Sequence, residues 1–178
     1  MNHILTAALL LLLTLAARAQ FHPANGAMPA PGHANLISAV LHAKPCHQRH
    51  TSMGGVGLEL RGIYIDSGLL WLVFHGVNHS AIDFRPATMH IEIRDKRSFK
   101  RRALQERLLT PMLKSEPSVL SADSSVLFCY GLVPRVPSKR QELSIEWMER
   151  NGDRRLQLQV SAAAILTARR LSPVAHKN

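Results

Sequence analysis

Residues 56–77 read VGLELRGIYIDSGLLWLVFHGV, and this stretch decides the fold class. Apolar and charged residues alternate from Leu58 to Arg61, which is the two-residue period of a half-buried β-strand. Asp66-Ser67-Gly68 then predicts a turn. The returning segment, residues 69–77, is apolar on both faces, as expected of a strand in the middle of a sheet. The stretch therefore predicts an antiparallel hairpin at the centre of a β-sheet.

More segments with the same period follow along the chain, at residues 89–94, 126–132, 143–148 and 156–160. Asn151-Gly152 favours a tight hairpin turn between the last two. About seven short strands separated by turns predict an all-β fold, an antiparallel immunoglobulin-like β-sandwich with short helical segments near each end. Its predicted core consists of Leu60, Tyr64, Leu70, Leu72, Phe74, Ile91, Ile93, Phe128, Ile145, Trp147, Leu156 and Leu158.

The two ends of the chain differ from this pattern. Residues 1–19 hold an apolar run followed by Ala17-Arg18-Ala19, which is typical of a secretory signal peptide and too short to span a bilayer comfortably. Residues 20–55 are expected to be a linker with a short helix, residues 56–171 the sandwich domain, and residues 172–178 a tail. The protein is therefore expected to be exported.

Positive charge is the strongest compositional feature, with a net charge of +10. Such a balance favours anionic partners such as nucleic acid, acidic lipid, lipopolysaccharide or an acidic protein. The charge is densest between Arg94 and Arg102. Sites that bind single-stranded nucleic acid interleave aromatic residues with the charged ones, and in this run only Phe99 is aromatic. The charge is therefore compatible with nucleic-acid contact, but the sequence indicates no specific recognition. The residues of this basic run are Arg94, Lys96, Arg97, Lys100, Arg101 and Arg102.

The sequence carries no catalytic signature. A nucleophile elbow, a zincin helix motif and a phosphate-binding loop are all missing, which predicts a non-enzymatic protein without a cofactor. His42, Cys46, His47 and His50 raise the hypothesis of a zinc site. No second ligand pair at finger-like spacing accompanies them, so a solvated loop is the preferred interpretation and no metal site is assigned.

Two further signals each have two interpretations. Cys46 and Cys129 are the only cysteines, and they either form a disulfide in an oxidising compartment or stay reduced, with Cys129 as a core residue. Asn78-His79-Ser80 matches the glycan acceptor pattern, but an Asn-led turn after a central strand is the preferred interpretation.

Several segments taken in order resemble the TraN family of Bacteroides conjugative transposons, over about Val56 to Leu171. The segments are LRGIYIDSGLLWLVF, NHS, DF, IEIRDKRSFKRRALQE and IEWMERNGDRRLQLQV. The resemblance implies a structural, non-enzymatic component of a conjugative transfer apparatus, in an envelope-spanning type IV secretion channel. It also implies a periplasmic location at the outer membrane and partners among the other channel subunits.

The chain departs from that family at its start, where residues 20–55 stand in place of a further β-domain, so the resemblance is to a short form. Helix propensity alone would make residues 98–109 a helix, whereas the resemblance implies a strand there. The basic run would then lie on an edge strand that faces another subunit. The alternative function is an independent periplasmic binding module for anionic polymers such as DNA or lipopolysaccharide.

Overall fold

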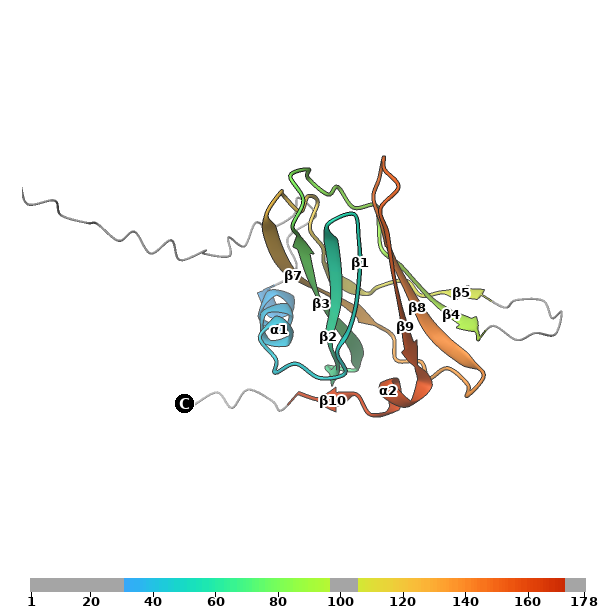
Figure 1. Cartoon of the computed structure of the whole chain (residues 1–178). Coiled ribbons are helices and arrows are strands. Elements are labelled where there is room, and N and C mark those ends of the chain that lie inside the picture. The colour runs from blue at the N-terminus through green and yellow to red at the C-terminus, as the bar shows by residue number, and fades with distance from the viewer. Residues whose placement is uncertain (1–30, 97–105, 172–178) are drawn as a thin grey trace, which may run out of the picture.

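The computed structural model describes residues 31–96 and 106–171, and these form two sheets packed face to face (Figure 1). The predicted all-β sandwich is confirmed, with ten strands in the described residues rather than about seven. The helices are α1 (Pro31–Leu41) and α2 (Ala162–Leu166). The strands are β1 (Arg49–Met53), β2 (Val56–Asp66), β3 (Leu69–Asn78), β4 (His90–Asp95), β5 (Glu106–Leu108), β6 (Leu113–Ser115), β7 (Ser124–Leu132), β8 (Gln141–Met148), β9 (Arg155–Ser161) and β10 (Arg169–Arg170).

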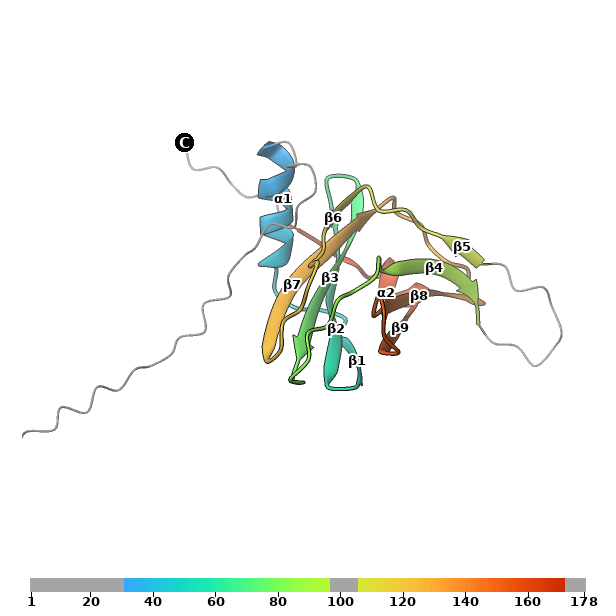
Figure 2. The same ribbon diagram turned by 90° about the horizontal axis from the view of Figure 1, so that it is seen from above.

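The strand order separates the two layers. The first sheet has the order β1-β2-β3-β7-β6, with β10 added alongside β2, and the second has the order β5-β4-β8-β9. All pairings are antiparallel except that of β10 with β2. Figure 2 shows the two sheets from above, with α1 against the outer side of the first sheet.

The β2–β3 hairpin forms where the sequence predicts it. Ser67 and Gly68 are the two loop residues, and both have positive φ angles, 49° and 74°. Two consecutive positive φ angles are the geometry of a type I′ turn, whose twist matches that of the flanking strands. Strand β3 lies between β2 and β7, which confirms its predicted central position.

A β-bulge in β2 changes which residues face the core. The pairing with β3 shifts between Leu60 and Gly62, so one extra residue is inserted into the alternation. Ile63 therefore takes the inward position that strict alternation would give to Tyr64. Tyr64 faces outward instead, and a side chain at Gly62 would collide with its phenol ring.

The main core lies between the two sheets. All twelve residues predicted for the core are buried, and all except Tyr64 belong to this cluster. Its centre is aromatic: the Phe84 and Trp147 rings lie 4.7 Å apart between centroids, and Phe128 lies 5.1 Å from Trp147. Edge-to-face and tilted contacts of this kind are favourable beyond the area they bury.

A second core, which the sequence did not predict, lies outside the first sheet beneath α1. Val40 is fully buried at the centre of the helix face, and it packs with Trp71, Val73 and Cys129 of the sheet. The Tyr64 hydroxyl donates to the carbonyl of Lys44 at 2.8 Å and fixes the chain after the helix. The central strands of the first sheet are thus buried on both faces, which explains their unbroken apolar sequence.

The folded unit begins earlier than the sequence indicated. Strand β1 pairs with β2 through Gly54 and Gly55, whose φ angles of 57° and 78° also form a type I′ turn. The predicted boundary at Val56 therefore falls inside the folded unit, because α1 and β1 pack on the sandwich. The predicted signal peptide and tail lie outside the described residues. In the part that the structure describes, no helix is long and apolar enough to cross a membrane.

The helical segment predicted near the end of the chain is the five-residue helix α2. The Ser161 hydroxyl caps α2 by accepting the Ala164 N–H at 3.3 Å. The helix ends at Leu166, and the chain then forms the short strand β10, which pairs in parallel with β2.

Candidate interaction surface

The basic run begins on an internal strand. Arg94 lies on β4, between β5 and β8, and its Nε atom is 3.3 Å from Oε1 of Glu142. Both side chains are largely buried, with exposed fractions of 20% and 16%, so this pair stabilises the sheet. Lys96 is exposed at the end of the strand. The other members of the predicted interaction edge, Arg97, Lys100, Arg101 and Arg102, lie outside the described residues.

Strand β5 forms the edge of the second sheet beside the basic run. It runs antiparallel to β4, with Leu108 opposite Glu92, so the chain reverses between Lys96 and Glu106. The strand interpretation of residues 98–109 holds for Glu106–Leu108, and residues 98–105 lie outside the described part of the chain. The Leu109 N–H donates to the Ile91 carbonyl at 2.8 Å. In an antiparallel ladder, successive residues of an edge strand direct their N–H and C=O groups alternately toward and away from the neighbouring strand. The backbone groups of Leu108 therefore point away from β4.

A recess lies behind this edge, at the mouth of the sandwich. It has a volume of about 340 Å³. Arg107 is opposite Ile93 in the ladder, so both side chains leave the same face of the sheet. Arg135 enters from the loop between β7 and β8. The residues lining the recess are Ile93, Arg107, Arg135, Val136, Pro137 and Gln141.

The loop that carries Arg135 is held in place by backbone hydrogen bonds. The Lys96 N–H donates to the Arg140 carbonyl at 2.8 Å, and the Gln141 N–H donates to the Ser138 carbonyl at 2.9 Å. Pro137 is buried at the base of the loop. The recess therefore has one wall from the second sheet and one from a loop that is fastened to that sheet.

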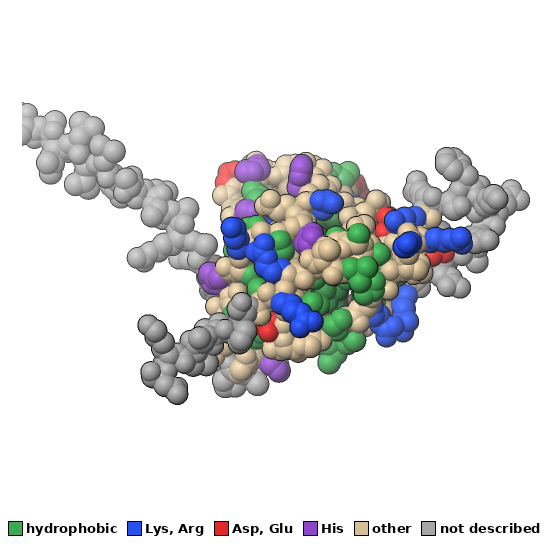
Figure 3. All heavy atoms as spheres, turned by 90° about the horizontal axis from the view of Figure 1, so that it is seen from below, with side chains coloured by type: hydrophobic (Ala, Val, Ile, Leu, Met, Phe, Trp, Pro, Cys, Tyr) green, Lys and Arg blue, Asp and Glu red, His purple; other side chains and the backbone are tan. Residues whose placement is uncertain are grey.

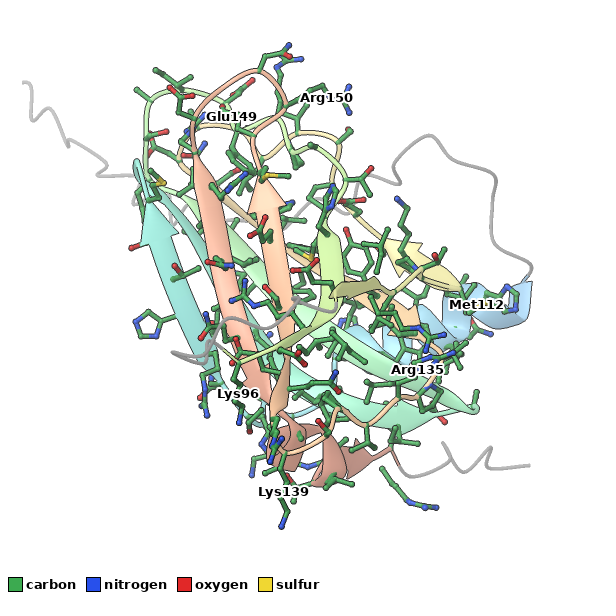
Figure 4. All side chains as sticks on the ribbon, turned by 90° about the vertical axis from the view of Figure 1, so that its right-hand side faces the viewer. Lys96, Met112, Arg135, Lys139, Glu149 and Arg150 are labelled. Atoms are coloured by element: carbon green, nitrogen blue, oxygen red, sulfur yellow. The ribbon has the colours of Figure 1, made fainter. Side chains whose placement is uncertain are left out.

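Exposed apolar side chains lie on the segments that form or adjoin the recess: Val136 lines it, whereas Leu108 leaves the opposite face of the sheet from Arg107. Leu108 is 62% exposed, Met112 63%, Val133 51% and Val136 55%. In Figure 4, Met112 and Arg135 lie to the right, Lys96 to the left and Lys139 at the bottom, with Arg150 at the top, the opposite end from Lys139. Figure 3 shows hydrophobic side chains gathered beside Lys and Arg groups on the face seen from below. Exposed apolar groups bordered by polar ones are typical of interaction sites.

The candidate zinc ligands do not come together. The His42 ring bonds the Ser38 carbonyl at 2.7 Å, whereas the His47 ring bonds the Thr167 carbonyl at 3.0 Å. His50 lies on β1, beside a groove of about 530 Å³ that also contains Glu59 and His75. Within residues 31–96 and 106–171, no three His, Cys, Asp or Glu side chains form a group that could hold a metal ion.

The two cysteines are free thiols that border the same outer core. The Cys46 Sγ faces the Ile63 carbonyl at 3.6 Å and is partly buried. Cys129 is fully buried, and this burial raises the pKa of its thiol to about 12. The structure therefore contains no disulfide between Cys46 and Cys129.

Residues 33–170 match the model of a family described as a domain of unknown function, DUF4138. The chain belongs to the DUF4138 family. The matched region begins in α1 and ends in β10, so the DUF4138 domain coincides with the whole folded unit. No curated protein matches the chain.

Asn78 fixes the loops at one end of the DUF4138 domain. Its side chain is fully buried, and its Nδ2 atom donates to the carbonyls of Ile82, Leu120 and Ser121 at 2.9–3.2 Å. Its Oδ1 atom accepts the backbone N–H of Ser80 at 3.0 Å and the hydroxyl of the same residue at 2.7 Å. The Asn-led turn is confirmed, and burial closes this position to glycan attachment in the folded protein.

Arg154 is a second fixed point at this end, which the sequence reasoning missed. Its guanidinium bonds both carboxylate oxygens of Glu149, the carbonyl of Asp83 and the hydroxyl of Ser80, and it lies 5.2 Å from the Phe84 ring centroid. The hydrogen bonds from Arg154 lower the pKa of Glu149. The only local signal was an acid and an arginine that flank the Asn151-Gly152 turn. The arrangement is structural and lies at the end of the molecule opposite to Lys139 (Figure 4).

Proposed function

We propose that this DUF4138 protein is a non-enzymatic structural component of a conjugative transfer apparatus, a core subunit of an envelope-spanning type IV secretion channel. Two sequence features support the proposal: the signal-like residues 1–19, and the ordered motifs that resemble the TraN family. The protein would then be exported to the periplasm, associate with the outer membrane and act through contacts with other channel subunits.

The observation that carries this proposal is the β4–β5 side of the sandwich. An edge strand with outward-pointing backbone groups is a ready template for contact with another chain. Here it is accompanied by the exposed side chains of Leu108 and Met112, and the basic run is attached to the same strand pair. One side of the molecule thus offers a polar edge, apolar contacts and positive charge together.

The deciding experiment reverses charge in the basic run. Arg101→Glu combined with Arg102→Glu should lower the recovery of the protein with other channel subunits from envelope fractions. The matched control is Arg150→Glu combined with Arg155→Glu, which makes the same charge change on exposed residues at the other end of the molecule. The control should keep the stability of the parent, because an exposed charge contributes only about 0–1 kcal/mol, and the urea unfolding midpoint of the Arg101→Glu, Arg102→Glu variant is measured beside it. Equal loss of recovery in both variants, or none in either, would refute the proposed contact.

The net charge of +10 favours a second candidate function, an independent periplasmic binding module for anionic polymers such as DNA or lipopolysaccharide. Phosphate contacts make duplex DNA binding fall with salt, at a log–log slope of roughly −0.9 per phosphate neutralised. A salt series on the Arg101→Glu, Arg102→Glu variant separates the two functions. Lost, salt-sensitive DNA binding alongside unchanged subunit recovery would favour the binding module.

A further inference from the structure

We propose that the recess between β5 and the β7–β8 loop binds an acidic peptide segment of a protein partner, and that an apolar side chain of this segment packs against Val136. The proposal rests on the proposed function, because that function makes the partner another protein. It adds the chemistry of the segment of that partner that is bound. It concerns described residues only, and it assigns a role to two arginines that lie outside the basic run.

The charge of the recess selects a negatively charged ligand. Six described residues line the recess; two of them are Arg107 and Arg135, and none is acidic. Both arginines are exposed, and neither forms an ion pair with a carboxylate of the described residues. A guanidinium is planar and offers paired donors, which match the two oxygens of a carboxylate. Two such groups at one opening therefore fit the side chains of aspartate or glutamate.

Apolar residues in the lining favour a peptide over a free anion. Ile93, Val136 and Pro137 also line the recess, and Val136 is the exposed one of these three. Val136 is 55% exposed, so a ligand that covers it removes apolar area from water. Gln141 accepts the Ser138 N–H through its Oε1 atom at 3.2 Å, which leaves its amide nitrogen to donate to a peptide carbonyl. An acidic side chain, an apolar side chain and a backbone carbonyl thus each have a counterpart.

The shape of the recess argues against the other anionic ligands. A flat bilayer is bound by protruding apolar groups, whereas these arginines line a concave site. Single-stranded nucleic acid requires aromatic platforms, and none of the described residues that line the recess is aromatic. The Lys96–Arg140 hydrogen bond joins the end of the loop that leads into β8 to the end of β4.

The test is a selection of peptides by the purified, full exported chain. The probe is a displayed library of randomised dodecapeptides, selected on the parent protein and on three variants. The parent should enrich peptides in which aspartate or glutamate lies near an apolar residue. Arg107→Glu combined with Arg135→Glu should enrich lysine and arginine peptides instead, which loss of folding cannot produce. The affinity of the best acidic peptide should fall about tenfold or more in this variant.

Two further variants separate the parts of the site. Val136→Ser should keep the acidic preference and weaken the apolar one. Arg150→Glu combined with Arg155→Glu, at the other end of the molecule, should select the same peptides as the parent. Enrichment of neutral or basic peptides by the parent, or an unchanged preference after the Arg107 and Arg135 reversal, would overturn the proposal. So would binding to vesicles of phosphatidylglycerol or to oligonucleotides with no peptide enriched.

The outcome is distinguishable from that of the proposed function. Selection of acidic peptides by a protein that is recovered alone from the envelope would support the recess and refute the channel role. Recovery with channel subunits that survives the Arg107 and Arg135 reversal, with no peptide enriched, would support the channel role and refute the recess.

Discussion

Asn78 and Arg154 illustrate how single polar side chains hold loops that the sheets alone would leave apart. Asn78 joins the end of β3 to residues around Leu120, and Arg154 joins the β8–β9 hairpin to Asp83. Both are hydrogen-bonded with several partners, as buried polar groups must be to offset their loss of hydration. The loops at this end are therefore held by hydrogen bonds from an amide and a guanidinium group, whereas the two sheets are held together by apolar packing.

The Glu149–Arg154 pair predicts a specific pH dependence of stability. The pKa of Glu149 is lowered from the ordinary 4.5 by the hydrogen bonds from Arg154. A group with a depressed folded pKa contributes stability that is present above its unfolded pKa and is lost as pH falls through the folded one. Glu149→Gln should therefore destabilise the protein most at neutral pH, and the difference should shrink below about pH 4.5. Urea unfolding of both proteins from pH 7 to pH 3 measures this difference.

Asp153→Asn is the control for this prediction, because Asp153 is an exposed carboxylate in the same hairpin. It should change stability by no more than about 0.5 kcal/mol at either pH. A Glu149→Gln effect that stays constant, or grows, as the solution is acidified would contradict the assigned role of the pair.

The two cysteines should differ in reactivity in the native protein. Cys129 is fully buried and burial raises its pKa to about 12, so its reactive thiolate form is scarce. Cys46 is only partly buried. We expect an alkylating reagent to modify Cys46 first and Cys129 only on unfolding, as peptide mass spectrometry would show. If neither thiol of the purified protein reacts even after unfolding without reductant, the two cysteines form the disulfide instead.

At the scale of elements, the packing of the two tryptophans depends on glycines in the strands opposite. A Cβ atom at Gly76 of β3 would lie 2.9 Å from the Trp147 ring, and one at Gly131 of β7 would lie 3.0 Å from the Trp71 ring. Gly76 leaves room on the inner face of the first sheet and Gly131 leaves room on its outer face. Each large ring thus lies over a strand position that has no side chain.

This arrangement predicts that two alanine substitutions on neighbouring strands will differ. Gly76→Ala should destabilise by about 1–3 kcal/mol, because the added methyl group overpacks the Trp147 contact. Gly57→Ala makes the same change on β2, where the nearest atoms to the new Cβ are 4.0 Å away. It should be neutral or stabilise by about 0.5–1 kcal/mol, because alanine loses less backbone entropy on folding. Equal unfolding midpoints in urea for the two variants would contradict the assigned packing.

The sequence predicted the long strands and missed the short ones, for reasons that lie in their residues. Strands β2, β3, β8 and β9 are long enough to display a period, whereas β6 has three residues and β10 has two. Strand β5, also of three residues, was expected only through the family resemblance. Strand β1 reads RHTSM and is polar on both faces, so only the Gly54-Gly55 turn could have indicated it. The bulge at Leu60–Gly62 was invisible because each residue there remains compatible with strict alternation.

At the scale of the whole molecule, the candidate site was only partly visible in the sequence. The basic run was evident from its charge, and its first residue, Arg94, lies on β4 beside the edge strand of the second sheet. The sequence could not show that Arg107 and Arg135 line the same recess. They come together only because β5 pairs with β4 and because the β7–β8 loop passes beside that edge. Tertiary neighbours of this kind leave no local pattern. The second core was missed because its helix packs on strands that already had one buried face.

The two cores also make the molecule separable into parts. Val40 is fully buried between α1 and the first sheet, so Val40→Asp should undock the helix at a cost on the order of 3 kcal/mol while the sheets stay packed. In a Trp147→Phe background, Trp71 is the only tryptophan, and its fluorescence should shift to longer wavelength. Ser38→Asp, on the exposed face of the same helix, should leave the emission unchanged. A loss of all β-sheet circular dichroism in Val40→Asp would show that the two cores do not separate.

The surface on which α1 packs also determines when this helix can dock during synthesis. The helix ends at Leu41, but β7, which contributes Cys129 to that surface, begins only at Ser124. The first of the described elements to leave the ribosome therefore has no complete surface to pack on until most of the chain has followed it. Until then the apolar outer faces of β2 and β3 have no cover of their own. Helix α1 is thus made early and packs on the sheet late. Until then the nascent protein needs protection from aggregation, which covers most of its translation.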